Sequence, residues 1–438
     1  MEKNNKLIMP NIYAKRPSHK EFGLTPMMVQ FLKVKENNLD NILFYRMGDF
    51  YEMFFEDAIL ASSLLEITLT KRGEWNSKNI PMCGVPAHSA ETYIEKLIKK
   101  GYRVSICEQI EKEALEQNRG PMHREVVRVI TPGTVTEDSL LNPEFHNYLA
   151  SISKVGNECS VSWVDLTTGN FFVEKLFNTS KSSIESALER LKPKEIILSR
   201  KLEHVLPSNF NACISFQSDN IFNSAFAADK LKNFFNVISL ESFGNFGRSC
   251  LSASGSIISY IELTQKGQLP LLEILKMWKT NDVLEIDSIT RRSLEIMNTY
   301  NGEIKGSLYN SINYTVTRGG GRLLTERLNA PLVSHKKIEE RLDMVSMFFN
   351  FEDFLKEFKL IIFKMPDLLR ALSRLQFNRA GPRDLASIKD GIFIFNEIID
   401  HFKSKKLMQK PKKVESLVDN LKIEKSLPLL LESALAET

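Results

Sequence analysis

Gly48-Asp49-Phe50-Tyr51-Glu52 is the stretch that decides the fold of the first part of this chain. It follows the apolar run Ile42-Leu43-Phe44-Tyr45, which predicts a short buried strand. It precedes residues 58–65, whose leucines recur at helical spacing. Phe50 and Glu52 are two residues apart, so their side chains point to the same side of an extended backbone but diverge in a helix. If the segment is extended, the ring and the carboxylate face one partner together.

A ring and a carboxylate on one face suit contact with nucleic-acid bases. An aromatic side chain wedges between poorly stacked bases, and a carboxylate bonds to a base edge. The alternative for Phe50 is core packing, because Met53, Phe54 and Phe55 follow it and large apolar side chains are mostly buried. The stretch alone leaves both interpretations open.

Composition indicates an ordinary globular chain with a basic start. The 438 residues are enough for about three domains, and the chain is 43% hydrophobic and 26% charged. A net charge of +4 does not by itself require a nucleic-acid partner. Five basic residues against one acidic residue fall within residues 1–20, which predicts a flexible basic tail able to touch phosphates.

Cysteine usage and hydropathy exclude several classes. The five cysteines are widely separated, with no CxxC pair or Cys/His cluster, so neither a zinc site nor a disulfide framework is predicted. No signal peptide is present, and no apolar run approaches the length of a membrane span. These features predict a soluble cytoplasmic protein without a membrane partner.

Residues 21–135 predict a first α/β domain. Thr25 and Pro26 are a helix cap and a first-turn proline, and Gly101 ends a later helix. The expected elements are a helix over 25–37, a strand over 42–45, a helix over 58–65, a strand over 67–70, a basic turn at 71–73, a loop over 80–86, a helix over 89–100, and strands over 103–108 and 125–130.

Two further domains are predicted after a turn cluster at residues 131–134. Residues 136–265 alternate like three strands, then give a helix and another strand, an order that resembles the opening of an RNase H-like sheet. Residues 266–438 have apolar side chains at spacings of three and four, which predicts an all-helical domain without strands.

No catalytic constellation is found, because the chain has no GxSxG, HExxH or phosphate-loop motif. The RNase H-like order nevertheless raises a metal-dependent nuclease as an alternative, with Asp165 at a strand end as a first carboxylate. Glu174 and Glu195 lie at strand edges without an obvious common face. A turn role for Asp165 before residues 166–169 is the competing interpretation.

Other candidate DNA contacts lie in the first domain. Lys71 and Arg72 are basic residues beside a predicted turn, suited to phosphates but equally to solvent. Met82 is a candidate apolar wedge for a minor groove, with core packing as the alternative.

Several blocks of the chain resemble the MutS family of bacterial DNA mismatch repair proteins. The blocks are residues 25–73, 80–110, 126–141, 150–173, 290–297, 315–332 and 365–385. The resemblance implies a mismatch-recognition domain over 21–135, an RNase H-like connector over 136–265, and helices of the lever or core domain, incomplete here, over 266–438.

The resemblance also implies residue roles. Phe50 and Glu52 occupy the family's Phe-x-Glu positions, in which the Phe stacks on a mispaired base from the minor groove and the Glu hydrogen-bonds that base. Lys71, Arg72 and Gln109 fall in segments that lie near DNA in the family. The implied DNA partner is a duplex containing mismatches or small loops.

The family continues into a clamp and an ATPase domain with a GGKST-type phosphate loop, which this sequence does not contain. ATP and magnesium are therefore expected only for that domain, and no cofactor, metal or catalytic site is expected in this chain. The resemblance implies a MutL-like repair partner and a dimer for the full-length protein. A truncated product without function of its own is a further alternative.

Overall fold

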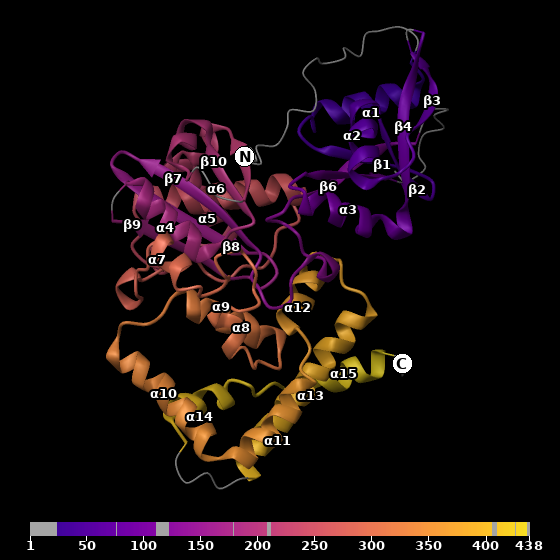
Figure 1. Ribbon diagram of the computed structural model, residues 1–438. Helices are drawn as coiled ribbons and strands as arrows, with labels where there is room; N and C mark the ends of the chain where they lie inside the picture. The colour runs from indigo at the N-terminus through magenta and orange to yellow at the C-terminus, as the bar shows by residue number, and fades with distance from the viewer. Residues whose placement is uncertain are drawn as a thin grey trace. The chain divides into compact units, whose positions relative to one another are not determined.

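The computed structural model describes residues 24–75, 77–110, 122–177, 179–207, 212–404, 410–424 and 426–435 (Figure 1). The predicted basic tail over 1–20 lies outside these residues. The chain forms two compact units. The first comprises residues through Leu140 with 147–164 and 193–269, and the second comprises 141–146, 165–192 and the chain from Pro270 onward.

The first unit begins with a six-stranded mixed sheet and its helices. Its strands are β1 (Ile42–Met47), β2 (Phe50–Phe54), β3 (Thr70–Trp75), β4 (Lys78–Pro86), β5 (Val104–Gln109) and β6 (Arg124–Ile130), in the order β3-β4-β2-β1-β5-β6. The helices are α1 (Pro26–Glu36), α2 (Phe55–Leu65) and α3 (Ala90–Lys99), with short 3-10 turns at Ala87–Ser89 and Asp138–Leu140. Strand β1 pairs antiparallel with β2 and parallel with β5.

Local chemistry sets the helix ends of this sheet domain. The Thr25 hydroxyl accepts a hydrogen bond from the Met28 amide at 3.4 Å, and Pro26 occupies the first turn, as the sequence predicts. Gly101 follows α3 with φ +82°, a conformation that side chains rarely adopt. The helices predicted over residues 25–37 and 89–100 are confirmed as α1 and α3.

A buried ion pair lies beneath β1. Lys35 Nζ lies 2.8 Å from Asp57 Oδ2 and also donates to the Asn41 carbonyl, and both charged side chains are essentially inaccessible to solvent. The same Asp57 oxygen accepts the Leu43 amide of β1 at 2.9 Å. The pair therefore ties α1 and α2 to the strand that leads into residues 48–52.

The rest of the first unit has β7 (Tyr148–Val155), β8 (Glu158–Asp165), β10 (Glu195–Ser199) and β11 (Cys213–Gln217), in the order β11-β10-β7-β8. Helices α5 (Ser224–Phe235) and α6 (Arg248–Gln265) belong to it, with 3-10 turns at Arg200–Val205 and Asp219–Phe222. Gly255 of α6 lets α5 approach closely, because a Cβ there would lie 2.5 Å from the Ala227 Cβ.

Helix α6 meets β7 and β8 through paired serine hydroxyls. The pairs are Ser151 with Ser256 at 2.7 Å, Ser153 with Ser252 at 2.6 Å, Ser160 with Ser249 at 2.8 Å, and Ser162 with Ser254 at 3.1 Å. All eight side chains are buried. Each hydroxyl satisfies another, so the contact avoids the cost of burying an unpaired polar group.

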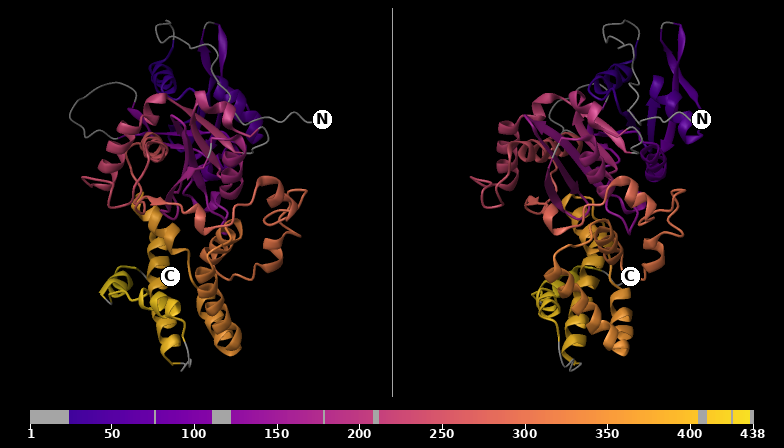
Figure 2. Two further views of the ribbon diagram at one scale, coloured as in Figure 1. Left: turned by 90° about the vertical axis from the view of Figure 1, so that its left-hand side faces the viewer. Right: turned by 60° about the vertical axis from the view of Figure 1, so that its left-hand side comes forward.

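The second unit is mainly helical (Figures 1 and 2). It contains β9 (Phe171–Leu176), which pairs parallel with the short β12 (Lys276–Met277), and a 3-10 turn at Thr280–Asp282. Its helices are α4 (Lys181–Leu191), α7 (Ser288–Ser293), α8 (Leu308–Ile312), α9 (Arg318–Asn329), α10 (His335–Asn350), α11 (Glu352–Phe363), α12 (Leu368–Gln376), α13 (Pro382–Ser404), α14 (Lys412–Asp419) and α15 (Ser426–Ala434). Met347, Phe354, Ile398 and Val414 form a shared core of α10, α11, α13 and α14.

The predicted change from α/β structure to helices is confirmed, but the first sheet differs from the prediction in two places. The expected strand over 67–70 and basic turn over 71–73 are instead strand β3, which starts only at Thr70. The expected loop over 80–86 lies within strand β4. Pro81 and Pro86, which predict a loop, pair with Lys71 and Phe50 in the sheet. Strand β12 is a smaller departure from the all-helical expectation.

Among the described helices, none is long and apolar enough to cross a membrane.

Candidate nucleic-acid interface

Phe50 stands at the tip of the β1–β2 hairpin. Met47 pairs with Phe50 across a two-residue turn, Gly48–Asp49, in which Gly48 has φ +60°. The Ala87 amide donates to the Asp49 carbonyl at 2.8 Å, which attaches the turn to the end of β4. The segment after Gly48 is thus a strand of its own before α2 begins at Phe55.

The strand alternation separates the exposed and buried side chains of β2. The Phe50 ring is 48% exposed and the Glu52 side chain is 15% exposed, whereas Tyr51 and Met53 are buried. The expectation for an extended backbone is therefore confirmed: Phe50 and Glu52 share one side. Core packing, the alternative for Phe50, is wrong.

Tyr51 anchors the hairpin from its buried side. Its hydroxyl donates to a Glu108 carboxylate oxygen of β5, and its ring contacts Phe44 at a centroid distance of 5.9 Å. The Arg46 guanidinium lies 5.2 Å from the Tyr51 ring centroid. Burial, followed by the hydrogen bond to Glu108, raises the pKa of Tyr51 to about 12. The phenol therefore stays protonated and keeps its donor at neutral pH.

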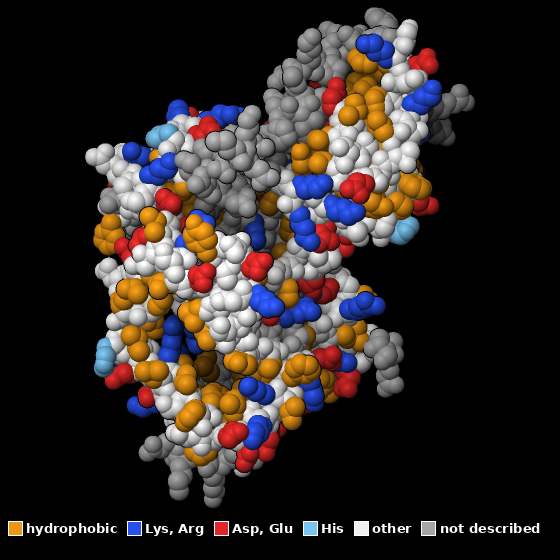
Figure 3. Space-filling model, in the orientation of Figure 1, with side chains coloured by type: hydrophobic (Ala, Val, Ile, Leu, Met, Phe, Trp, Pro, Cys, Tyr) orange, Lys and Arg blue, Asp and Glu red, His pale blue; other side chains and the backbone are white. Residues whose placement is uncertain are grey.

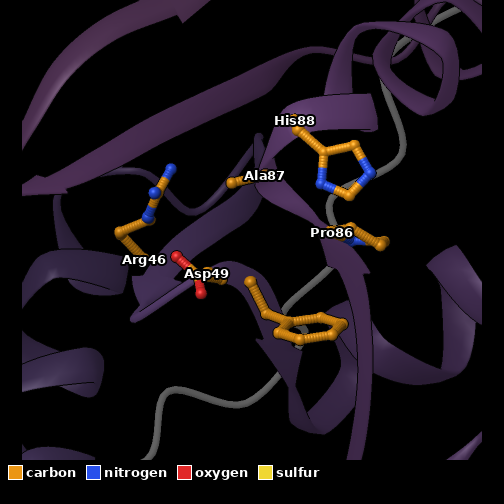
Figure 4. A pocket seen from close by; sticks show the side chains of 6 residues that line it. Arg46, Asp49, Pro86, Ala87 and His88 are labelled. Carbon is orange, nitrogen blue, oxygen red and sulfur yellow. The ribbon is translucent and has the colours of Figure 1, made fainter.

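A pocket opens beside the exposed ring (Figure 4). Its lining residues come from the hairpin and from the end of β4 with the following turn: Arg46, Asp49, Phe50, Pro86, Ala87 and His88. His88 is exposed. The lining thus combines an apolar ring with the guanidinium of Arg46, the carboxylate of Asp49 and the imidazole of His88, so its charge is mixed.

Glu52 has a charged partner two strands away. Arg72 of β3 donates through Nη1 to Glu52 Oε2, and the two strands are separated by β4. The Arg72 side chain is 41% exposed. The sequence named both residues as candidates, and the structure brings them together as an ion pair.

The other predicted contacts occupy different positions. Lys71 is exposed on β3, and Gln109 lies half-buried at the end of β5, lining a second pocket with Arg46, Gly48 and Glu108. Met82 is half-buried and packs against the core of α1 and β1. Among the described residues drawn in Figure 3, basic and acidic side chains are interspersed.

Sequence reasoning missed Arg46 and His88. Both line the pocket beside Phe50 and fall within the blocks that resemble the MutS family, yet no role was inferred for either of them. Recognising β4 as a strand would have placed Pro86 opposite Phe50 and therefore His88 near the ring. Arg46 carries the weaker signal of a charged residue at the end of an apolar strand.

The nuclease alternative finds no support in the carboxylates on which it depends. Glu174 forms an ion pair with Arg190. Buried Glu195 accepts hydrogen bonds from the Thr131 hydroxyl, the Gly133 amide at 2.9 Å and the Tyr260 hydroxyl at 2.5 Å. Among the described residues, no three His, Cys, Asp or Glu side chains are grouped to hold a metal ion.

Asp165 has the turn role. Its Oδ1 accepts the Thr167 amide at 2.9 Å and hydroxyl at 2.7 Å, and its Oδ2 lies 2.7 Å from His146 Nδ1. Burial raises the pKa of Asp165, but the hydrogen bond and charge of His146 and the bonds from Thr167 outweigh it and hold the pKa at about 2. Both oxygens of the Asp165 carboxylate therefore contact groups of the surrounding turn and His146.

Because of Asp165, the free energy of unfolding is expected to decrease as the pH falls into the acid range. Its folded pKa of about 2 lies below the ordinary value of about 3.9. Its contribution of roughly 2–3 kcal/mol is therefore complete above pH 5 and is lost as pH falls toward 2. Urea unfolding of the wild type and of Asp165→Asn should show a stability gap at pH 7 that shrinks by about half at pH 3. A gap independent of pH would contradict this origin.

Comparison with known proteins agrees with this architecture, a multidomain α/β protein with a candidate base-contacting hairpin followed by helices. Family models described as MutS domain I, MutS domain II and MutS domain III match residues 25–139, 147–273 and 289–437. The chain belongs to the MutS family of DNA mismatch repair proteins.

Curated relatives give the same family. The DNA mismatch repair protein MutS of Dinoroseobacter shibae is 43% identical over 84% of this chain and 42% of the relative. The proteins of the same name from Wolbachia pipientis wMel and Rhizobium meliloti are each 42% identical over 84% of this chain, and over 44% and 41% of their own lengths. The chain thus spans about two fifths of the length of these relatives.

Proposed function

We propose that this chain senses mismatched or looped duplex DNA, with Phe50 as a minor-groove wedge and Glu52 as a polar discriminator. The observation that carries the proposal is the exposed Phe50 ring on the same side of β2 as Glu52, at the tip of an anchored hairpin. Mismatched bases stack poorly, so inserting a ring and kinking the duplex there costs less than at paired bases.

The proposal divides the work among three domains: recognition over 21–135, connection over 136–265, and a helical lever over 266–438. Lys71, Arg72 and Gln109 act as lesser DNA contacts, and Met82 as a neighbouring apolar contact. A MutL-like repair partner, and a dimer with ATP and magnesium use elsewhere in the full-length protein, belong to the same proposal. So does a cytoplasmic location, which suits five cysteines that are all buried and form no disulfide.

Binding to matched and mismatched duplexes tests the proposal directly. Gel-shift titrations would compare one sequence as a matched duplex, with a single G·T pair, and with one unpaired base. We expect at least about tenfold tighter binding to the last two, which corresponds to ~1.4 kcal/mol. Equal affinity for all three duplexes would reject the proposed function.

Replacing Glu52 by alanine is expected to reduce discrimination without weakening binding to matched DNA. An ionised carboxylate near phosphates is repelled, and it is tolerated where a base edge offers a donor. Matched-duplex affinity should be preserved or rise, and the mismatch preference should fall several-fold in the same titrations. Equal weakening on both duplexes would argue against this role of Glu52.

A further inference from the structure

The Arg72–Glu52 ion pair reaches across β4, the strand that lies between β3 and β2 in the sheet. Neighbouring strands are about 4.8 Å apart, so the backbones of β3 and β2 are about 10 Å apart across β4. The residue of β4 opposite Glu52 is Gly84, so β4 presents no side chain beside Glu52 at this position. A Cβ on Gly84 would lie 3.6 Å from Glu52 Cγ, so the carboxylate side chain already lies over this glycine.

A β-bulge places Arg72 for this contact. Lys71 pairs with Pro81 and Glu74 pairs with Asn79, so β3 has one more residue than β4 across this interval. Gly73 in the bulge has φ +76°. An extra residue bends a strand and redirects its side chains. The bulge thus provides a local reason why Arg72 reaches toward Glu52, whereas the adjacent Lys71 is exposed.

The pair combines two groups with different natural partners on DNA. A guanidinium binds backbone phosphate, which carries no sequence information, whereas a carboxylate accepts from a base edge. Because the Arg72 side chain is 41% exposed, solvent weakens its attraction to Glu52 and leaves it open to exchange. While they are paired with each other, the guanidinium is not available to a phosphate and the carboxylate is not available to a base edge.

We propose that Arg72 is a positioning residue for Glu52 and exchanges partners only on mismatched DNA. On a matched duplex Glu52 finds no base donor and keeps Arg72, so the guanidinium makes no phosphate contact. On a mismatch the base edge takes the carboxylate, and the released guanidinium binds a phosphate. This inference rests on the proposed function of Phe50 and Glu52, and it makes one phosphate contact conditional on base recognition.

The salt dependence of binding tests the exchange. Each phosphate neutralised adds about 0.9 to the slope of log affinity against log salt concentration. We expect the wild-type slope to be steeper by about 0.9 on a G·T duplex than on the matched duplex. The difference should vanish in Arg72→Gln, which lacks the guanidinium. It should also vanish in Glu52→Gln, where Arg72 is free to bind phosphate on both duplexes.

Two further variants separate this role from a structural one. Arg72→Lys keeps a cation that can pair and exchange, so it should retain at least half of the slope difference. Lys71→Gln removes a neighbouring contact that is proposed for both duplexes, so it should lower both slopes equally and leave their difference intact. A difference that survives in Arg72→Gln, or that disappears equally in Lys71→Gln, would overturn the proposal.

The outcomes distinguish this inference from the proposed function. Wild-type protein that binds both duplexes equally at every salt concentration would reject both. Tighter binding to the G·T duplex with equal slopes would leave mismatch sensing intact and overturn the partner exchange. Circular dichroism melts of each variant would identify any loss of folding. If Arg72→Gln does not fold, the slope difference measured for Arg72→Lys, which keeps a cation at this position, tests the proposal instead.

Discussion

Phe50→Ala is expected to abolish the preference for a G·T duplex over a matched duplex. The exposed ring supplies the stacking surface at the hairpin tip, and base–aromatic stacking contributes about 1–3 kcal/mol. Affinity for the mismatched duplex should therefore fall by about 5- to 150-fold, while the weaker binding to matched duplex changes little. Gel-shift titrations of both duplexes measure the two affinities.

A matched control is available on α5. Phe226 is 50% exposed, close to the exposure of Phe50, and lies outside the hairpin. Phe226→Ala removes a similar exposed ring and should leave the preference unchanged. A preference retained in Phe50→Ala, or lost equally in both variants, would count against the wedge.

Asp57→Ala is expected to produce the largest loss of stability in the first sheet. It leaves the buried Lys35 ammonium without its carboxylate, and breaking a buried pair in this way costs about 3–5 kcal/mol. The Leu43 amide of β1 also loses its acceptor. Thermal melts by circular dichroism should show a markedly lower transition for the part of the chain that carries the hairpin.

Two companion variants isolate the cause. Asp57→Asn keeps an acceptor for the Leu43 amide while removing the charge, so most of the loss should remain. Combining Lys35→Met with Asp57→Leu removes both charges and should recover part of the stability, because apolar replacements of buried pairs are often tolerated. If the double variant is as unstable as Asp57→Ala, the loss of stability does not come from the unpaired charge of Lys35.

The sequence predicts correctly that Phe50 and Glu52 lie on the same side of a strand, but it does not predict the whole of the sheet around them. Spacing of two between Phe50 and Glu52 is enough to place both on one side once the backbone is extended, and the exposed ring agrees. Strand β4 escapes prediction because Pro81 and Pro86 remove backbone donors within a short interval. Pairing with β2 on one side and β3 on the other nevertheless keeps it in the sheet.

The Arg72–Glu52 contact lies beyond sequence reasoning for a different reason. It depends on a bulge in β3 and on Gly84 of β4. Strand β4 is not predicted from the sequence, because Pro81 and Pro86 favour a loop there. Neither residue spacing nor composition specifies which strand lies between the two partners. The partner of Asp165 is likewise not predictable from the sequence. Its turn role can be predicted from the residues that follow it, but its contact with His146 cannot.

The paired serines between α6 and the strands β7 and β8 have a mechanical consequence. Apolar side chains attract one another without strict direction, so a helix packed through leucines is held in register along a sheet by the fit of its side chains alone. Hydroxyl pairs hold at fixed distances and angles, and a shift of one helical turn would break all four at once. Helix α6 and these two strands should therefore move as one rigid body, so that a displacement at one end of the helix displaces the other end without a change in the register between helix and strands.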